Sequence, residues 1–228
     1  MNTWTLTHRR LGMWSALSMF VISGLYVATG VAWLLSSAAA GRDRLGPVDP
    51  FLAILEALIV ASAPPMVVIM AAVHAYAPRD KRVYSLSALA FMSLLAGTTC
   101  LIHFVRLTAV RRLDPANASG LVEIFSFQWP SAAFAGDLLV WDLFLGLCLL
   151  FAAPVFRGGR LHKAVRVSMR LSGVLCIVGL LGPTLGDLRF QYPAIFGYAG
   201  VFPIVCLLLA ILFARSKPDE TQSADEDM

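Results

Sequence analysis

The chain has 228 residues, of which 58% are hydrophobic and only 14% are charged, and its mean hydropathy is +0.75. Soluble domains average about 45–50% apolar and about 25% charged residues, so this composition excludes an ordinary soluble protein and indicates a polytopic membrane protein. The formal charge of +4 does not indicate nucleic-acid binding, because basic residues at the ends of membrane spans serve to orient those spans.

Six apolar runs have the length of about 20 residues that a helix needs to cross a bilayer. They predict an all-α, six-transmembrane-helix bundle that forms one unit over residues 1–214. The expected spans lie near residues 11–37, 51–76, 83–110, 130–156, 164–188 and 194–214. The first run exceeds the core of a signal peptide, about 7–15 residues, so we expect it to remain as a span. Residues 215–228 are polar and acidic, and we expect a disordered cytoplasmic tail.

Two features interrupt the apolar pattern. Pro64 and Pro65 stand in the middle of the second run, and because each removes an i→i−4 hydrogen bond we expect a kink there. The longest loop, residues 111–130, ends in an amphipathic segment rich in aromatic residues. We expect this segment to lie on the membrane surface or to fold back over the bundle.

Small residues recur at steps of three or four along the fifth run. They are Gly173, Cys176, Gly179, Pro183 and Gly186. Such a stripe allows the backbone of a neighbouring helix to approach closely. One hypothesis is therefore that this face binds a second copy of the chain or another membrane protein.

The distribution of basic residues predicts the orientation. The N-terminus, the second and fourth loops and the tail contain twelve of the Lys and Arg residues, and the other side contains six. Because cytoplasmic loops carry the excess of Lys and Arg, we expect both termini in the cytoplasm. The short loops and a composition rich in Ala, Leu and Arg favour a bacterial inner (cytoplasmic) membrane.

Ionisable residues gather toward the expected extracytoplasmic ends of the spans. His103 and Arg106 are three residues apart and share one helical face. At 1.5 Å per residue, Asp142 lies about 7 Å deeper than Asp137. Ionisable side chains in spans usually face the bundle interior and mark functional pathways, so we predict a ligand-binding pocket open to the extracytoplasmic side. Its candidate residues are Glu56, His103, Arg106, Asp137, Asp142, Asp187 and Arg189.

Three functions fit this pattern. The first is binding or transport of a small ligand or ion, with Arg106 and Arg189 holding an anionic group while the acids and His103 handle protons or cations. The second is an intramembrane enzyme that uses His103 with a carboxylate as general base or metal ligands. The third is a membrane scaffold or assembly factor that uses the small-residue stripe.

A simpler interpretation stands beside these. Arg106 with Asp137, and Arg189 with Asp187, could also be ion pairs that only hold helices together. The sequence contains no motif that identifies a cofactor.

Overall fold

The computed structural model describes residues 4–39, 50–113 and 119–218. Every regular element in these ranges is helical, and six helical stretches are long and apolar enough to cross a membrane. The prediction of an all-α protein with six spans is thereby confirmed. The observed stretches are Leu6–Ala38, Phe51–Tyr76, Arg79–Arg112, Ala132–Val155, Arg160–Leu185 and Leu188–Arg215. Most of the predicted acidic tail, residues 219–228, lies outside the described residues.

The first three spans are built mainly from single helices. They are α1 (Leu6–Ala39), α2 (Phe51–Tyr76) and α3 (Arg82–Thr108), the last flanked by the 3-10 turns η1 (Arg79–Lys81) and η2 (Val110–Arg112). A short loop helix, α4 (Ser119–Ile124), follows.

The last three spans are segmented. Span four consists of α5 (Ala132–Leu138), the π-helix η3 (Leu139–Phe144), α6 (Leu145–Ala152) and the 3-10 turn η4 (Ala153–Val155). Span five consists of α7 (Arg160–Gly179) and α8 (Leu181–Leu185). Span six consists of the 3-10 turn η5 (Leu188–Gln191), α9 (Tyr192–Ile195), the π-helix η6 (Phe196–Val201) and α10 (Phe202–Arg215).

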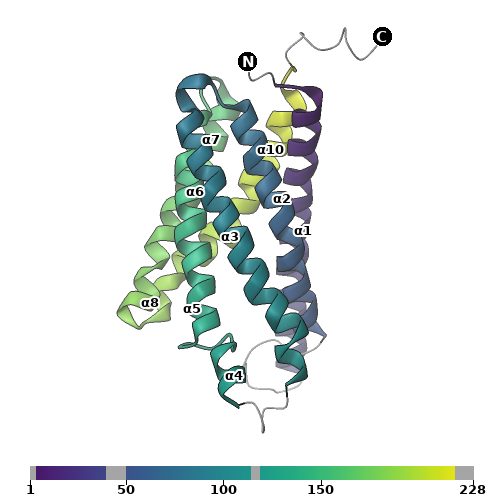
Figure 1. Ribbon diagram of the computed structural model, residues 1–228, viewed down its shortest axis with the longest axis vertical. Coiled ribbons are helices and arrows are strands. Elements are labelled where there is room, and N and C mark those ends of the chain that lie inside the picture. The colour runs from purple at the N-terminus through teal and green to yellow at the C-terminus, as the bar shows by residue number, and fades with distance from the viewer. Residues whose placement is uncertain (1–3, 40–49, 114–118, 219–228) are drawn as a thin grey trace.

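The helices form an antiparallel bundle whose two ends differ (Figure 1). Helix α1 begins and α10 ends at one end, which we call the terminal end; α4 lies at the opposite end, which we call the far end. Helix α1 packs on α2 and α10, α2 packs on α3, α3 packs on α6, and α7 packs on α6 and α10. The central core is apolar and rich in methionine; its fully buried members include Met66, Met70, Met92, Leu149 and Phe213.

Helix α2 runs without interruption through the two prolines, where we expected a kink. Pro64 has no N–H to offer the Val60 carbonyl four residues earlier. That carbonyl instead accepts a hydrogen bond from the Cys100 thiol of α3, with an S···O distance of 3.7 Å. A neighbouring helix thus satisfies a backbone group that the proline releases inside the membrane.

The small residues of span five bring helices of the same chain together. A Cβ atom added to Gly173 would lie 2.8 Å from the Gly146 carbonyl oxygen of α6, and one added to Gly179 would lie 2.2 Å from Cβ of Ala194 in α9. The prediction of close approach was wrong for Gly186, which has open space around it. This glycine has φ +71° and ends α8 as its left-handed cap, a conformation that glycine adopts at little cost.

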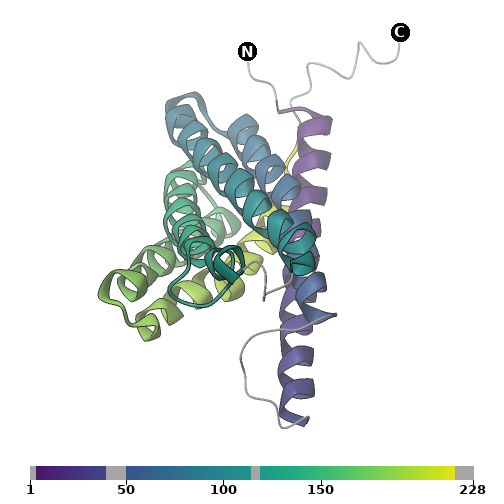
Figure 2. The same ribbon diagram turned by 60° about the horizontal axis from the view of Figure 1, so that its bottom comes forward.

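The second half of α1 is largely free of neighbours. Figure 2 shows it running past the other helices, with the start of α2 alongside it. Its side chains are apolar and exposed, among them Val21, Leu25, Val31 and Leu35. This is the pattern of a span that faces lipid, and it leaves room between α1 and span six at the same depth.

Candidate functional site

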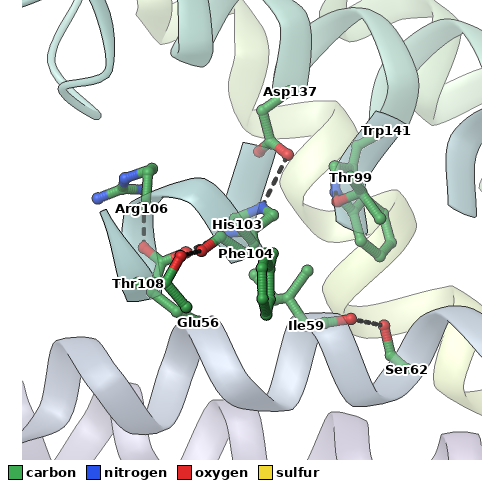
Figure 3. Close-up of polar contacts among 10 residues, drawn as sticks. All are labelled: Glu56, Ile59, Ser62, Thr99, His103, Phe104, Arg106, Thr108, Asp137 and Trp141. Atoms are coloured by element: carbon green, nitrogen blue, oxygen red, sulfur yellow. Dashed lines mark hydrogen bonds and ion pairs between the residues drawn. The ribbon is translucent and has the colours of Figure 1, made fainter. Parts of the chain in front are cut away.

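Four ionisable side chains from three helices meet near the far end of the bundle (Figure 3). The His103 ring of α3 lies between two carboxylates: Nδ1 is 2.5 Å from Oε2 of Glu56 in α2, and Nε2 is 3.1 Å from Oδ1 of Asp137 in α5. Arg106, one turn after His103, donates from Nη1 to Oε1 of Glu56 at 2.8 Å. We call Glu56, His103, Arg106 and Asp137 the far-end cluster; the sequence analysis had selected all four.

The cluster is buried and balanced in charge. The side chains of His103 and Glu56 are 1% and 4% exposed, and those of Arg106 and Asp137 are 11% and 15% exposed. Two acids face two basic groups, so the four side chains carry no net charge when all are ionised. Charges at this depth are tolerated only when paired and hydrogen-bonded, which is the arrangement seen here.

The pairing of Arg106 differs from the sequence expectation. We had considered an ion pair with Asp137, but the guanidinium binds Glu56 and its Cζ lies 3.7 Å from the centroid of the Phe127 ring. Phe127 also contacts the His103 ring, with centroids 5.2 Å apart. The loop before span four therefore folds back over the bundle, which is one of the two arrangements that its amphipathic pattern predicted.

Local hydrogen bonds fix the approach of span four to this cluster. Ser131 caps α5 by accepting from the Phe134 backbone N–H at 3.1 Å, and its hydroxyl donates to the Ser126 carbonyl. One turn deeper, Nε1 of Trp141 donates to Oγ1 of Thr99 at 3.2 Å. Thr99 lies four residues before His103, so the same face of α3 holds span four at Asp137 and again one turn deeper at Trp141.

Asp142 lies next to the far-end cluster in the chain but makes different contacts. Its side chain is 0% exposed, and neither carboxyl oxygen has a hydrogen-bond partner of good geometry in the described structure, although the Gln191 amide lies beside it. Oδ2 would lie 3.2 Å from a Cβ atom added to Gly179. The carboxyl group therefore occupies the crossing of η3 with α7, inside a π-helix, a distortion that is frequent at functional sites.

The structure separates Asp187 and Arg189 from the cluster. They form an exposed, two-pronged ion pair with each other, with Nη2 of Arg189 2.7 Å from Oδ2 of Asp187. They follow α8, which stands on the opposite side of the bundle from α1 in both views (Figures 1 and 2). Hydrogen bonds from the Arg189 side chain and backbone hold the pKa of Asp187 below its ordinary value.

A pocket opens beside the far-end cluster, between α1, α2 and the two π-helical segments. Its walls are mainly apolar. Among the described residues that line it, Asp137 is the only carboxylate. The lining side chains that carry hydroxyl or indole groups are Ser23, Tyr26, Ser62, Trp141 and Tyr198.

Sequence reasoning did not find these pocket residues. Tyr26 and Trp141 stand in apolar runs where we had searched for ionisable groups alone. The hydroxyl of a buried tyrosine and the indole N–H of a buried tryptophan usually form a hydrogen bond. These polar groups inside apolar runs are the feature of the sequence that could have indicated a site. A hydropathy pattern does not show which faces of α1 and span six leave a gap.

Among the residues that the structure describes, no three His, Cys, Asp or Glu side chains are grouped so as to hold a metal ion. Comparison with protein-family models, with curated proteins and with solved structures gives no match for this chain. Function must therefore be inferred from the chemistry of the cluster and the pocket.

Proposed function

We propose that this protein binds, and carries across the membrane, small apolar molecules that bear a positive charge. The ligand would occupy the pocket between α1, α2 and the π-helices, with its cationic group at Asp137. We place the protein in a bacterial inner membrane with both termini in the cytoplasm and the far end toward the outside. The observation that carries this proposal is an apolar pocket in which the one carboxylate among the described lining residues belongs to the buried far-end cluster.

The lining and position of the pocket support an apolar ligand. Small-molecule sites typically have apolar walls with a few placed polar groups, and this pocket is lined in that way. Tyr26 and Val27, on the α1 side of the pocket, are exposed on the surface of a span. A molecule dissolved in the bilayer could therefore enter from the side, between α1 and η6.

The charges favour a cation over the anionic group first expected. Arg106 does not line the pocket, because Glu56 and Phe127 hold its guanidinium. Arg189 is exposed and paired with Asp187. The lining offers the Asp137 carboxylate together with the rings of Tyr26, Phe127, Trp141 and Tyr198, and aromatic faces attract cations.

Two observations weigh against the other hypotheses. Both ring nitrogens of His103 are engaged by carboxylates, so neither is open to a substrate as a general base. Gly173 and Gly179 of the small-residue stripe are covered by α6 and α9 of the same chain, so a partner would not reach them.

A pair of probes with the same shape and opposite charge tests the proposal. Tetraphenylphosphonium and tetraphenylborate are titrated calorimetrically into purified protein in detergent micelles, with empty micelles as the blank. We expect saturable binding of the phosphonium ion only. Asp137→Asn should weaken it by about 10- to 100-fold, because a contact to a charged group contributes about 1.5–3 kcal/mol.

The matched control is Asp187→Asn, which removes an exposed acid at the same end of the bundle and should leave binding unchanged. Ethidium, a fluorescent cation that crosses lipid slowly, then tests transport into proteoliposomes with wild-type protein and with the Asp137→Asn variant. Equal binding of both probes, or an Asp137→Asn variant that binds the phosphonium ion as well as wild type, would overturn the proposal.

A further inference from the structure

Asp137 stands between the pocket and His103. Its carboxylate lines the pocket, and its Oδ1 lies 3.1 Å from Nε2 of His103. On the other side of the ring, Nδ1 faces Oε2 of Glu56 at 2.5 Å. A ligand cation at Asp137 would therefore meet a carboxylate that already has a partner.

Hydrogen-bond chemistry fixes the number of protons that Glu56, His103 and Asp137 share. An ionised carboxylate only accepts hydrogen bonds, and a neutral imidazole has one N–H. Two ring nitrogens that each face a carboxylate therefore require either an imidazolium between two carboxylates or a neutral imidazole with one protonated acid. Both arrangements contain the same number of protons, and both give the three groups a net charge of one negative unit.

Arg106 brings the far-end cluster to neutrality. The guanidinium is bound to Glu56 and cannot be deprotonated in a protein. A ligand cation added at Asp137 would give this buried set a net positive charge where water cannot screen it well. The loss of one proton from the three groups restores neutrality.

Other titratable groups lie near the far-end cluster without touching the His103 ring. Tyr26 of α1 lies within electrostatic reach of Glu56, Arg106 and Asp137, and Tyr198 of η6 and Asp142 of η3 lie within reach of Asp137. In the described part of the chain, none of these three side chains hydrogen-bonds to His103. In the described structure the ring's own polar contacts are the two carboxylates, so the shared proton is the one that a cation would displace.

We propose that the far-end cluster exchanges one proton for each cation that docks on Asp137, so that the protein is a cation–proton exchanger. This inference rests on the proposed function. In the exchange step the Asp137 carboxylate releases the Nε2–H of His103 and pairs with the ligand cation. The proton passes to water, and neutral His103 keeps its Nδ1–H donated to Glu56. The Nε2–H bond breaks, an O–H bond forms on water, and the charge of the cluster with its ligand stays at zero.

Proton release on binding is the direct measurement. Tetraphenylphosphonium chloride is added to wild-type protein in weakly buffered micelles that contain a pH indicator dye, and bound cation is counted in parallel by equilibrium dialysis. We expect about one proton released per bound cation, and an affinity that rises with pH by up to about tenfold per pH unit.

Two histidine variants distinguish coupling between cation binding and proton release from a purely structural role of His103. In His103→Gln the shared proton is absent, so cation binding should release no proton and its affinity should no longer depend on pH. The control is His162→Gln, at the terminal end, where Nε2 of His162 contacts the Tyr76 hydroxyl at 2.8 Å. This variant should release protons like wild type.

The possible results are distinct. Absence of phosphonium binding to wild-type protein would overturn the proposed function itself. Binding with no proton release, or with release that persists in His103→Gln, would overturn the exchange while leaving the binding site in place. The wild-type titration alone decides between these results if the His103 variant fails to fold.

Discussion

The helices of this bundle are joined by different kinds of side-chain contact at its two ends. At the far end, helices α2, α3 and α5 are joined by the four ionisable groups of the far-end cluster. At the terminal end, α2 is joined to its neighbours by contacts between hydroxyl groups and histidine rings. The Tyr76 hydroxyl contacts His162 of α7 at 2.8 Å, and Nδ1 of His74 contacts the Ser85 hydroxyl of α3 at 2.9 Å.

Aromatic packing completes the terminal end. Trp4 lies against Tyr76 and Phe213, with ring centroids 5.2 and 5.4 Å apart, and its indole N–H donates to Ser216 at 3.0 Å. Among the described residues, the helices are therefore joined here without a buried carboxylate. The far-end cluster contains more charge than a joint needs and borders a pocket, which is why we assign function to that end.

The largest expected loss of stability comes from replacing Arg106. Arg106→Ala leaves the Glu56 carboxylate buried without its guanidinium, and breaking a buried pair in this way costs about 3–5 kcal/mol of unfolding free energy. Unfolding in mixed micelles, followed by circular dichroism, measures the loss. Arg106→Lys keeps the charge and should lose less.

A double variant distinguishes a charge effect from lost packing. Glu56→Gln combined with Arg106→Gln removes both charges and should be more stable than Arg106→Ala alone. If the double variant is as unstable as the sum of its single variants, the ion pair does not account for the stability of this end.

The second-largest expected change is a gain in stability. Asp142 is buried without a good hydrogen bond, so Asp142→Leu removes an unsatisfied polar group and should raise the unfolding free energy by about 1–3 kcal/mol. The same unfolding assay measures it, with Asp137→Leu as the matched variant that should destabilise. A destabilised Asp142→Leu variant would mean that the carboxyl group has a structural partner.

A smaller effect is expected at the terminal end. Tyr76→Phe removes the hydroxyl that contacts His162 and keeps the ring packed, so it should cost about 1 kcal/mol. Phosphonium binding should be unchanged, because the ring lies at the other end of the bundle. Weakened binding in this variant would show that the two ends are coupled and would contradict the assignment of binding to the far end alone.

The smallest effect concerns the exposed pair at the end of span five. Arg189 lowers the pKa of Asp187, so any stabilisation is present above the ordinary aspartate value of about 4 and is lost as the pH falls through the lowered pKa. Asp187→Asn should therefore match wild type in acid and differ little at neutral pH. Thermal unfolding at several pH values checks this, and a large difference at neutral pH would contradict it.

The spans and the members of the far-end cluster could be predicted because they depend on run length, depth and spacing. His103 and Arg106 share a face by spacing alone, and depth places Glu56 and Asp137 at their level. Depth does not say where a residue lies around the bundle. For that reason Asp187 and Arg189 were grouped with a cluster on the other side, and Arg106 was considered with Asp137 as its partner.

The pocket could not be predicted for a related reason. Tyr26, Trp141 and Tyr198 stand in continuous apolar runs, where hydropathy does not distinguish a face toward lipid from a face toward a gap. The two π-helical segments add one residue to a turn, and a regular helical period does not reveal them. The orientations of Trp141 and Asp142 depend on that extra residue.

The π-helix η3 has a consequence for how span four tolerates a change of length. Removing one residue from an ordinary α-helix turns everything beyond it by about 100°. Removing one from Leu139–Phe144 would instead convert the π-turn to a regular α-turn. The segments on either side would keep their phase, while Trp141 and Asp142 would rotate off the faces they now occupy. A one-residue deletion would thus change the Trp141 wall of the pocket while sparing the bundle and Asp137.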